Sequence, residues 1–207
     1  MALFTKLKEE KMIAILRGYT FDEATHTVDA LIEGGIRFLE VTMNTDGALH
    51  MVNQWRETYD QRAYIGVGTV LDEDMAWDAI QAGAQFIITP NLDERVVKVA
   101  LDNEVDIWPG TFTPSEIVRA TNLGVDAVKI FPLASLGISY LKEIRAPLDH
   151  IPMIATGGVT LENMHEYFNA GASAVGIGSS LVNKKLIQSG HFEELTVLAK
   201  QFVDKVK

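Results

Sequence analysis

The sequence Thr121-Asn-Leu-Gly-Val-Asp-Ala-Val-Lys-Ile-Phe-Pro132 joins the end of an expected helix to a short apolar strand that carries one lysine. Gly124 is placed to end the helix as a left-handed cap, and residues 126–131 form the expected strand. The same order of helix-like run, glycine and apolar run recurs around three further glycines, Gly35, Gly83 and Gly171. Neighbouring members of this set are about 40 to 50 residues apart, which is the length of two strand-and-helix units in a parallel sheet.

Eight strands are expected once the weaker apolar runs between these glycines are included. They lie near residues 12–17, 37–42, 64–68, 85–89, 105–108, 126–131, 152–156 and 174–178. A last helix is expected near residues 190–206, where it would close the chain against the first unit. Eight alternating units predict an α/β fold, a single-domain (β/α)8 barrel over residues 1–207. An open, doubly wound sheet is the alternative, because it uses the same local pattern.

Three expected helix starts combine a capping residue with an acid three positions later. They are Thr20 with Glu23, Asn91 with Glu94, and Thr113 with Glu116. Pro114 fits the first position of its helix, where the missing N–H does no harm.

The composition limits the classes of function. The 207 residues include 18 basic and 28 acidic ones, a formal net charge of −10, which argues against a nucleic-acid or anionic-membrane partner. No apolar run is as long as a membrane span, and the start of the chain lacks the apolar segment of a signal peptide. Cysteine is absent, which excludes disulfides and thiolate metal sites and favours a cytoplasmic location.

Lys129 stands inside an apolar strand, and such a position needs a reason. Burial of an unpaired ammonium is costly, so a lysine there either pairs with a carboxylate or loses its proton. A neutral lysine forms Schiff bases with carbonyl compounds. The alternatives are a lysine that reaches solvent from the strand end, or half of a structural ion pair. Glu40, within the apolar run Phe38-Leu-Glu-Val41, is the natural partner, as a buried salt bridge or as a general acid and base.

The carboxyl ends of the expected strands carry further polar groups, and this is where such barrels place their chemistry. Arg17 ends the first strand and either holds a carboxylate through a bidentate fork or reaches solvent. Gly157-Gly158 and Gly178-Ser179 follow the seventh and eighth strands, where many barrels bind a phosphate with backbone N–H groups. Turn glycines needed only for chain reversal are the alternative. The five histidines lack the spacing of metal ligands, so no metal site is expected.

Several segments together resemble one family, the 2-keto-3-deoxy-6-phosphogluconate aldolases with their 6-phosphogalactonate relatives, over essentially the whole chain. The segments are Ala14-Ile-Leu-Arg-Gly18, Leu39-Glu-Val-Thr42, Gly66-Val-Gly-Thr-Val70, Ile88-Thr-Pro-Asn91, Pro109-Gly110 with Thr113-Pro-Ser-Glu116, Lys129-Ile-Phe-Pro132, Thr156-Gly-Gly-Val159 and Gly176-Ile-Gly-Ser179. Each segment is a weak signal alone, whereas their order and spacing form a specific set.

The resemblance implies a homotrimeric class I aldolase that cleaves a keto-deoxy sugar acid phosphate to pyruvate and glyceraldehyde 3-phosphate without a cofactor. In that case Lys129 forms the iminium with the keto group and Glu40 moves protons through water. The residues that match the lining of the pyruvyl pocket are Thr69, Pro90, Phe131 and Thr156. Those that match the phosphate-binding backbone are Gly157, Gly158, Gly178 and Ser179.

One departure from the family pattern is Asn44, where many relatives have an arginine that grips the substrate carboxylate. The resemblance then gives this role to Arg17. The segment around Asn44 is similar to the galactonate branch and Thr156 to the gluconate branch, so the preferred epimer stays open. Three other functions compete: a 4-hydroxy-2-oxoglutarate aldolase, a phosphosugar isomerase or epimerase with Glu40 as the enolising base, and a phosphate-ligand binding barrel without catalysis.

Overall fold

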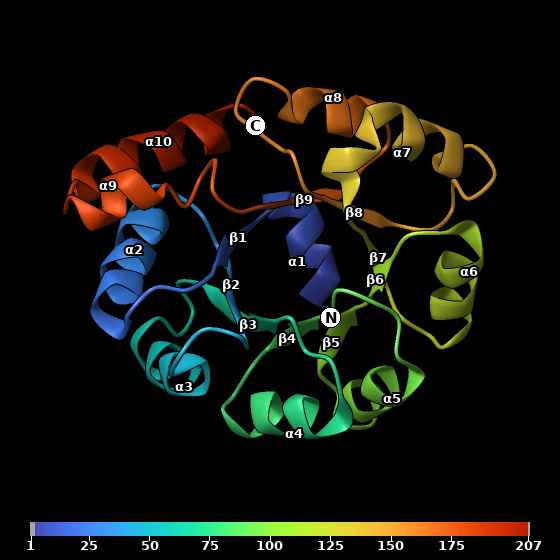
Figure 1. The fold of residues 1–207 in the computed structure, drawn as a ribbon, viewed down its shortest axis with the longest axis horizontal. Helices are drawn as coiled ribbons and strands as arrows, with labels where there is room; N and C mark the ends of the chain where they lie inside the picture. The colour runs from blue at the N-terminus through green and yellow to red at the C-terminus, as the bar shows by residue number, and fades with distance from the viewer. Residues whose placement is uncertain (1–2, 207) are drawn as a thin grey trace.

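The computed structural model describes residues 3–206 and contains one parallel sheet rolled around a central axis, with helices in a ring outside it (Figure 1). The strands are β1 (Met12–Leu16), β2 (Phe38–Thr42), β3 (Tyr64–Gly68), β4 (Phe86–Ile88), β5 (Asp106–Trp108), β6 (Gly110–Thr111), β7 (Val128–Ile130), β8 (Met153–Thr156) and β9 (Ala174–Ile177). Their order in the sheet is β5-β4-β3-β2-β1-β9-β8-β7-β6. The two edge strands are therefore consecutive in the chain.

Pro109 explains why nine strands appear where eight are expected. β5 pairs with β4 and β6 pairs with β7, and Pro109 between them has no N–H to give to a ladder. Its carbonyl still accepts a bond of 2.9 Å from the N–H of Lys129. The strand expected at 105–108 is thus β5, and the short strand β6, which was not expected, follows Pro109 and closes the ring. This confirms the (β/α)8 barrel against the open sheet.

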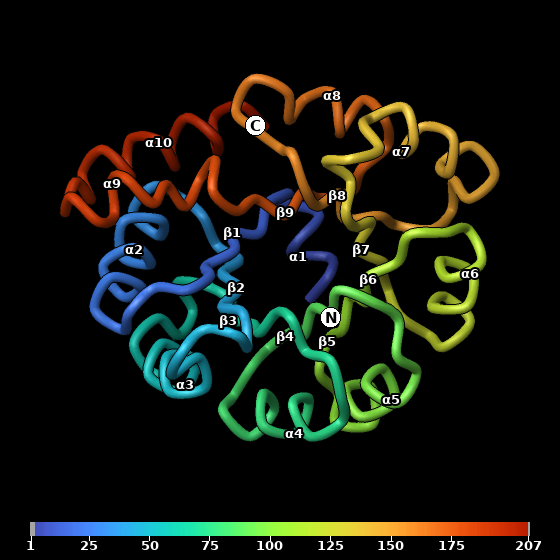
Figure 2. The backbone as a smooth tube through the Cα atoms, viewed as in Figure 1, coloured from blue at the N-terminus to red at the C-terminus, as the bar shows by residue number. Residues whose placement is uncertain are grey.

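The helices follow the strands as the alternating pattern predicts, and the tube in Figure 2 shows the chain passing regularly between the inner and outer layers. They are α1 (Leu3–Glu10), α2 (Phe21–Glu33), α3 (Ala48–Thr58), α4 (Glu73–Gln81), α5 (Glu94–Asp102), α6 (Pro114–Asn122), the 3₁₀ turn η1 (Leu133–Ser135), α7 (Gly137–Arg145), α8 (Met164–Asn169), α9 (Lys184–Gln188) and α10 (Phe192–Asp204). α10 packs beside α2, where the Thr196 hydroxyl donates to the Ala30 carbonyl at 3.2 Å.

The local signals at the helix ends are largely confirmed. Thr20 and Thr113 each form a complete capping box with the acid three residues on, and Pro114 is the first residue of α6. The four repeated glycines all have left-handed φ values between 94° and 98°. The prediction of Asn91 as a cap is wrong, because Asp93 caps α5 and accepts from the Arg95 N–H. A second good capping residue two positions later was the competing signal.

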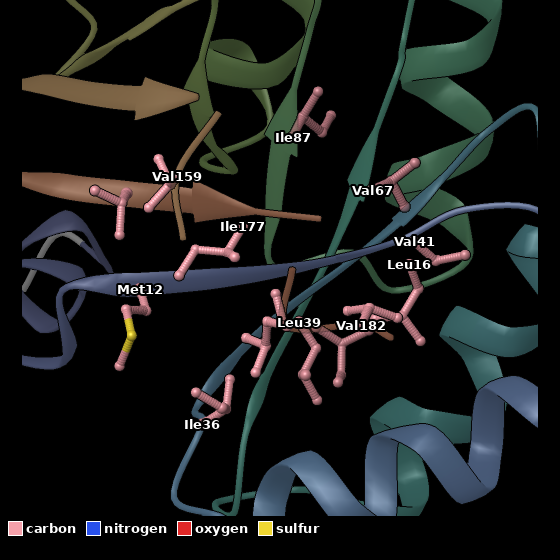
Figure 3. Packing of buried hydrophobic residues seen from close by; sticks show 14 of the residues in the cluster. Met12, Leu16, Ile36, Leu39, Val41, Val67, Ile87, Val159, Ile177 and Val182 are labelled. Carbon is pink, nitrogen blue, oxygen red and sulfur yellow. The ribbon is translucent and has the colours of Figure 1, made fainter. Parts of the chain in front are cut away.

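Two apolar regions support the barrel, one outside the sheet and one inside it. Outside, the strand side chains that point away from the axis pack under the helices, as Figure 3 shows for Leu39, Val41 and Val67. Inside, the amino ends of the strands are filled by an aromatic cluster that includes Phe38, with α1 lying across that end of the barrel (Figure 1). The carboxyl ends are left free for polar groups. No helix among residues 3–206 combines the length and apolarity that crossing a membrane requires.

Candidate active site

A cavity of about 420 Å³ opens at the carboxyl ends of the strands. All eleven residues predicted from the sequence line it: Arg17, Glu40, Thr69, Pro90, Lys129, Phe131, Thr156, Gly157, Gly158, Gly178 and Ser179. They come from loops and strands spread over most of the chain. The fold of the barrel, and not closeness in the sequence, brings them together. Five further residues that the sequence analysis did not single out also line the cavity, namely Ile15, Val159, Thr160, Gly176 and Ser180.

Strand alternation was the signal that could have identified some of these missed residues. Ile15 stands two positions before Arg17, and Gly176 two positions before Gly178, so each pair points to the same side of its strand. Gly176 also has a steric role, because a Cβ there would lie 2.7 Å from the Thr156 hydroxyl oxygen. The alternation of side chains along a strand could therefore have predicted from the sequence that Ile15 and Gly176 line the cavity.

Lys129 and Glu40 both lie in the cavity wall and are almost fully buried, with 6% and 1% of their surface exposed. Lys129 is the middle residue of β7 and Glu40 the middle residue of β2. No ion pair joins the two side chains in the described part of the chain, and Glu40 Oε2 has no hydrogen-bond partner there. The structural ion pair that the sequence left open is therefore not present.

Burial determines the protonation of both groups. Burial raises the pKa of Glu40 above its ordinary value, although the charges of Lys129 and Arg17 act in the opposite direction. Burial likewise lowers the pKa of Lys129; the Glu40 charge opposes this shift, whereas the Arg17 charge adds to it. Both shifts favour the neutral forms, a free amine and a carboxylic acid. A neutral amine is the form of lysine that attacks a carbonyl carbon.

Gly68 is required for the position of the Glu40 side chain. The two residues belong to neighbouring strands, β3 and β2. A Cβ on Gly68 would lie 1.6 Å from Glu40 Oε1, which is far inside contact distance. The glycine of the Gly66-Val-Gly-Thr69 segment therefore makes room for the carboxyl group in the cavity.

Phe131 lies next to the amine of Lys129. Its ring centroid is 4.8 Å from Lys129 Nζ, so the ring covers one side of the nitrogen. The ring keeps water from this side and adds to the desolvation that favours the neutral amine. Pro90 and Thr156 line the same cavity.

Arg17 is held at the rim of the cavity by two neutral oxygen atoms. Its guanidinium donates to Asn44 Oδ1 at 3.1 Å and to the Thr69 hydroxyl at 3.3 Å. Neither partner carries a negative charge, so the positive charge of Arg17 stays available to an anion. Thr69 has a φ of 60°, a left-handed conformation that is strained for a β-branched residue. Such strain is often found at functional sites.

The loop after β8 forms another part of the cavity wall. Gly157 and Gly158 have φ values of 107° and 75°, which favour glycine. A Cβ on Gly157 would lie 3.1 Å from the backbone nitrogens of Leu133 and Ala134 in η1. The backbone N–H groups of Gly157, Gly158, Ser179 and Ser180 donate to no protein acceptor within residues 3–206. Unpaired backbone donors around a cavity can bind an anion.

Metal ligands do not gather in this cavity or elsewhere in the described residues. Residues 3–206 contain no group of three or more histidine, aspartate or glutamate side chains placed to hold a metal ion. The five histidines are all exposed.

Residues 3–198 match the protein family described as KDPG and KHG aldolase. The chain belongs to this family. Among its relatives, the 2-dehydro-3-deoxy-6-phosphogalactonate aldolase of Escherichia coli is 36% identical over 171 residues, which are 82% of this chain and 83% of that protein. The 2-dehydro-3-deoxy-phosphogluconate aldolase of Haemophilus influenzae is 31% identical over 99% of this chain and 97% of its own length. The resemblance seen in the sequence segments is confirmed.

Solved structures of the family agree with this assignment. A native KDPGal structure superposes with a TM-score of 0.87 at 34% identity and covers 94% of this chain and 93% of its own. The KDPG aldolase of Legionella pneumophila superposes with a TM-score of 0.86 at 28% identity, covering 92% and 93% of the two chains. That structure holds pyruvate captured at low pH as a covalent carbinolamine intermediate. Relatives from both epimer branches thus match the chain to a similar extent.

Proposed function

We propose that this chain is a class I aldolase that cleaves 2-keto-3-deoxy-6-phosphogluconate or its galactonate epimer to pyruvate and glyceraldehyde 3-phosphate. The observation that carries the proposal is a buried amine, Lys129, which lines the cavity and has no ion-pair partner among residues 3–206, and whose burial favours the nucleophilic form. The acid Glu40 lines the same cavity, and so do backbone donors suited to a phosphate. Relatives with matching names support the same reaction.

The chemistry begins with attack of Lys129 Nζ on the C2 keto carbon, which gives a carbinolamine. Loss of water then gives an iminium, whose positive nitrogen is an electron sink. Removal of the C4 hydroxyl proton breaks the C3–C4 bond, and the bonding electrons move to the iminium to form an enamine while glyceraldehyde 3-phosphate leaves. Protonation of the enamine at C3 restores the iminium, and hydrolysis releases pyruvate. Glu40, directly or through a water, is assigned to these proton transfers. As the neutral acid it protonates the carbinolamine hydroxyl that leaves as water. The resulting carboxylate then takes the C4 hydroxyl proton and delivers a proton to C3, and it is protonated again when hydrolysis of the iminium releases the neutral amine.

The charges of the substrate define the remaining roles. The C1 carboxylate is assigned to Arg17, whose guanidinium donates at the cavity rim to two neutral oxygens, those of Asn44 and Thr69. Thr69, Pro90, Phe131 and Thr156 surround the pyruvyl carbons. The phosphate is assigned to the backbone N–H groups of four residues, Gly157, Gly158, Gly178 and Ser179. No step in this scheme requires a metal or an organic cofactor.

Two other functions make different predictions. A 4-hydroxy-2-oxoglutarate aldolase would use the same lysine, but its substrate has no phosphate for the free N–H groups of the glycine loops. A phosphosugar isomerase or epimerase would use Glu40 as the enolising base and form no adduct on Lys129. Both are therefore distinguishable by covalent trapping and by substrate comparison.

We also propose that the chain acts as one (β/α)8 domain, assembles as a homotrimer and works in the cytoplasm. The family resemblance supports the trimer, and the lack of cysteine suits a reducing compartment. Light scattering coupled to size-exclusion chromatography tests the trimer, since a monomeric mass at micromolar concentration would contradict it.

Borohydride trapping tests the main proposal. With pyruvate present, borohydride should add one reduced pyruvyl group to the protein, and peptide mapping should place it on Lys129. Lys129→Met should abolish this labelling and lower cleavage by about four orders of magnitude or more, as for other covalent nucleophiles, with an unchanged circular dichroism spectrum. Lys185→Met, at an exposed position of α9, is the matched control. An unlabelled protein, or a label on another lysine, would refute the Schiff-base mechanism.

A further inference from the structure

Three side chains hold three successive carbonyl groups of the loop after β8. The bonds run from the Tyr167 hydroxyl to the Gly157 carbonyl at 3.2 Å, from Asn163 Nδ2 to the Gly158 carbonyl at 2.9 Å, and from the Ser180 hydroxyl to the Val159 carbonyl at 2.6 Å. None of the three donors was singled out by the sequence analysis. Each of the three loop residues lines the cavity.

Holding a carbonyl in one direction also fixes the N–H of the next residue. In a trans peptide the C=O and N–H bonds point in opposite directions. Because Tyr167 and Asn163 hold the carbonyls of Gly157 and Gly158, the N–H groups of Gly158 and Val159 point away from these two side chains. Neither N–H has a protein acceptor within residues 3–206. The loop thus presents two adjacent, oriented donors beside the cavity.

Asn163 is bonded to this loop at both ends of its amide. Its Oδ1 accepts from the N–H of Thr160 at 2.8 Å, while its Nδ2 donates to the carbonyl of Gly158. The single side chain thereby closes a ring over residues 158–160. On the other side, the loop is confined by Ala134, whose Cα would lie 3.2 Å from a Cβ on Gly158. The loop is held between η1 and the start of α8.

Tyr167 lies four residues after Asn163, one helical turn along the same face of α8. Burial raises the pKa of Tyr167, so its hydroxyl remains protonated and able to donate. Only 3% of the residue is exposed. The N-cap residue of α8 and Tyr167 within the helix therefore donate to neighbouring peptides of the loop.

We propose that Asn163 and Tyr167 are positioning residues that preorganise the N–H groups of Gly158 and Val159 for the phosphate of the substrate. The inference rests on the proposed function, since it assigns the phosphate to this loop. If Asn163 and Tyr167 have this role, the preference for phosphorylated over unphosphorylated keto-deoxy sugar acids depends on two side chains that do not contact the substrate. N–H donors that are already oriented by their surroundings bind an anion without the cost of ordering the loop.

The test compares the full-length protein with Asn163→Ala and Tyr167→Phe. Affinity for inorganic phosphate, measured by titration calorimetry, should fall about tenfold in Asn163→Ala and somewhat less in Tyr167→Phe. The KM of the phosphorylated substrate should rise by the same factor, with kcat changed by less than about twofold. Exchange of the pyruvate methyl protons with D₂O should keep its KM, because pyruvate has no phosphate.

Matched controls separate positioning from general damage. Asn103→Ala removes an asparagine that donates to the Val99 carbonyl on α5, and Tyr140→Phe removes a hydroxyl that donates to the Phe112 carbonyl. None of these residues lines the cavity. Both should keep the phosphate affinity. Unchanged phosphate affinity in Asn163→Ala, or an equal rise in KM for pyruvate and for the phosphorylated substrate, would overturn the inference. Failure of the proposed function looks different, because the wild-type protein would then show no pyruvate exchange and no borohydride adduct.

Discussion

The inside of the barrel has two layers that are built from the same strands and differ completely in chemistry. Toward the amino ends, Phe38, Phe86, Trp108 and Phe4 of α1 form a cluster with ring centroids 5.0 to 6.2 Å apart. Two residues further along β2, Phe38 is succeeded by Glu40, which faces the cavity. Two residues along one strand therefore separate the buried aromatic cluster from the cavity with its reactive groups.

The aromatic layer explains why the polar layer can exist. Each buried ring contributes apolar area that stabilises the fold, whereas a buried acid without a hydrogen-bond partner costs stability. The aromatic layer at the amino ends of the strands, called the lower layer below, offsets this cost, and α1 shields it from solvent. The polar layer at the carboxyl ends is called the upper layer. We therefore expect substitutions in the upper layer to change kcat with little effect on the stability of the fold. Substitutions in the lower layer should lower the stability with little effect on kcat.

After Lys129→Met, Glu40→Gln should have the largest effect on the reaction among substitutions in the polar layer. The amide keeps the size of the side chain but cannot transfer protons, so kcat should fall by about 10²- to 10⁴-fold. The melting temperature should not fall, because burial already disfavours the ionised carboxyl group. Steady-state cleavage and thermal melts measure the two effects. Glu33→Gln, at the exposed end of α2, is the matched control, and a kcat like that of wild type would remove Glu40 from the mechanism.

Phe4→Ala tests the opposite prediction in the lower layer. Phe4 is 4% exposed and its ring packs against Trp108 at 6.1 Å. Its truncation should lower the free energy of unfolding by about 3 kcal/mol, measured in urea, while kcat per folded molecule stays within about twofold. Phe112→Ala, at a phenylalanine that is 39% exposed, should cost less than about 1 kcal/mol. A large loss of kcat in Phe4→Ala would show that the two layers are coupled.

The sequence predicted the upper layer well because polar residues in apolar strands are conspicuous. Lys129 and Glu40 each interrupt a buried run, and the period of two then places both on the inner side. The barrel followed from the regular glycine-ended units, whose left-handed conformations the structure confirms. The short strand β6 after Pro109 was not predicted, because it depends on closure of the ring, which a local pattern does not contain.

The residues that the sequence missed act through the backbone. Asn163 and Tyr167 have ordinary positions near and in a short helix, and nothing in their spacing indicates that they hold carbonyl groups of a loop. The same holds for Gly68, whose importance comes from an atom of a neighbouring strand. Asp93 was missed for a simpler reason, because Asn91 offered the same capping pattern. Such contacts are set by tertiary structure and not by local propensity.

The pH dependence of labelling tests whether the pKa of Lys129 is lowered in the upper layer. Only the neutral amine reacts, and burial lowers the pKa of Lys129 below the ordinary 10.5. The labelling rate at saturating pyruvate should therefore rise with pH and level off before pH 10.5. The Arg17 charge contributes to the lowering, so Arg17→Met should move the midpoint to higher pH. Arg37→Met, outside the cavity, should not, and an unmoved midpoint in Arg17→Met would exclude Arg17 as a cause.

The same shift affects stability. Between the folded-state pKa of Lys129 and 10.5, the unfolded chain binds more protons than the folded one, so unfolding free energy should rise with pH in this window. The Lys129→Met variant lacks the titrating group and should lose that part of the slope. Urea unfolding at several pH values gives the comparison.

Asn44→Ala has the smallest expected effect and tests how the rim of the cavity is organised. Asn44 Oδ1 accepts one of the two hydrogen bonds that hold Arg17, and the Thr69 hydroxyl accepts the other. With one bond lost, the guanidinium gains freedom and the KM of the substrate should rise about fivefold with little change in kcat. Asn53→Ala, at an exposed position of α3, should behave like wild type. If Asn44→Ala keeps the wild-type KM, Thr69 alone suffices to hold Arg17, and its strained backbone becomes the feature that organises the rim.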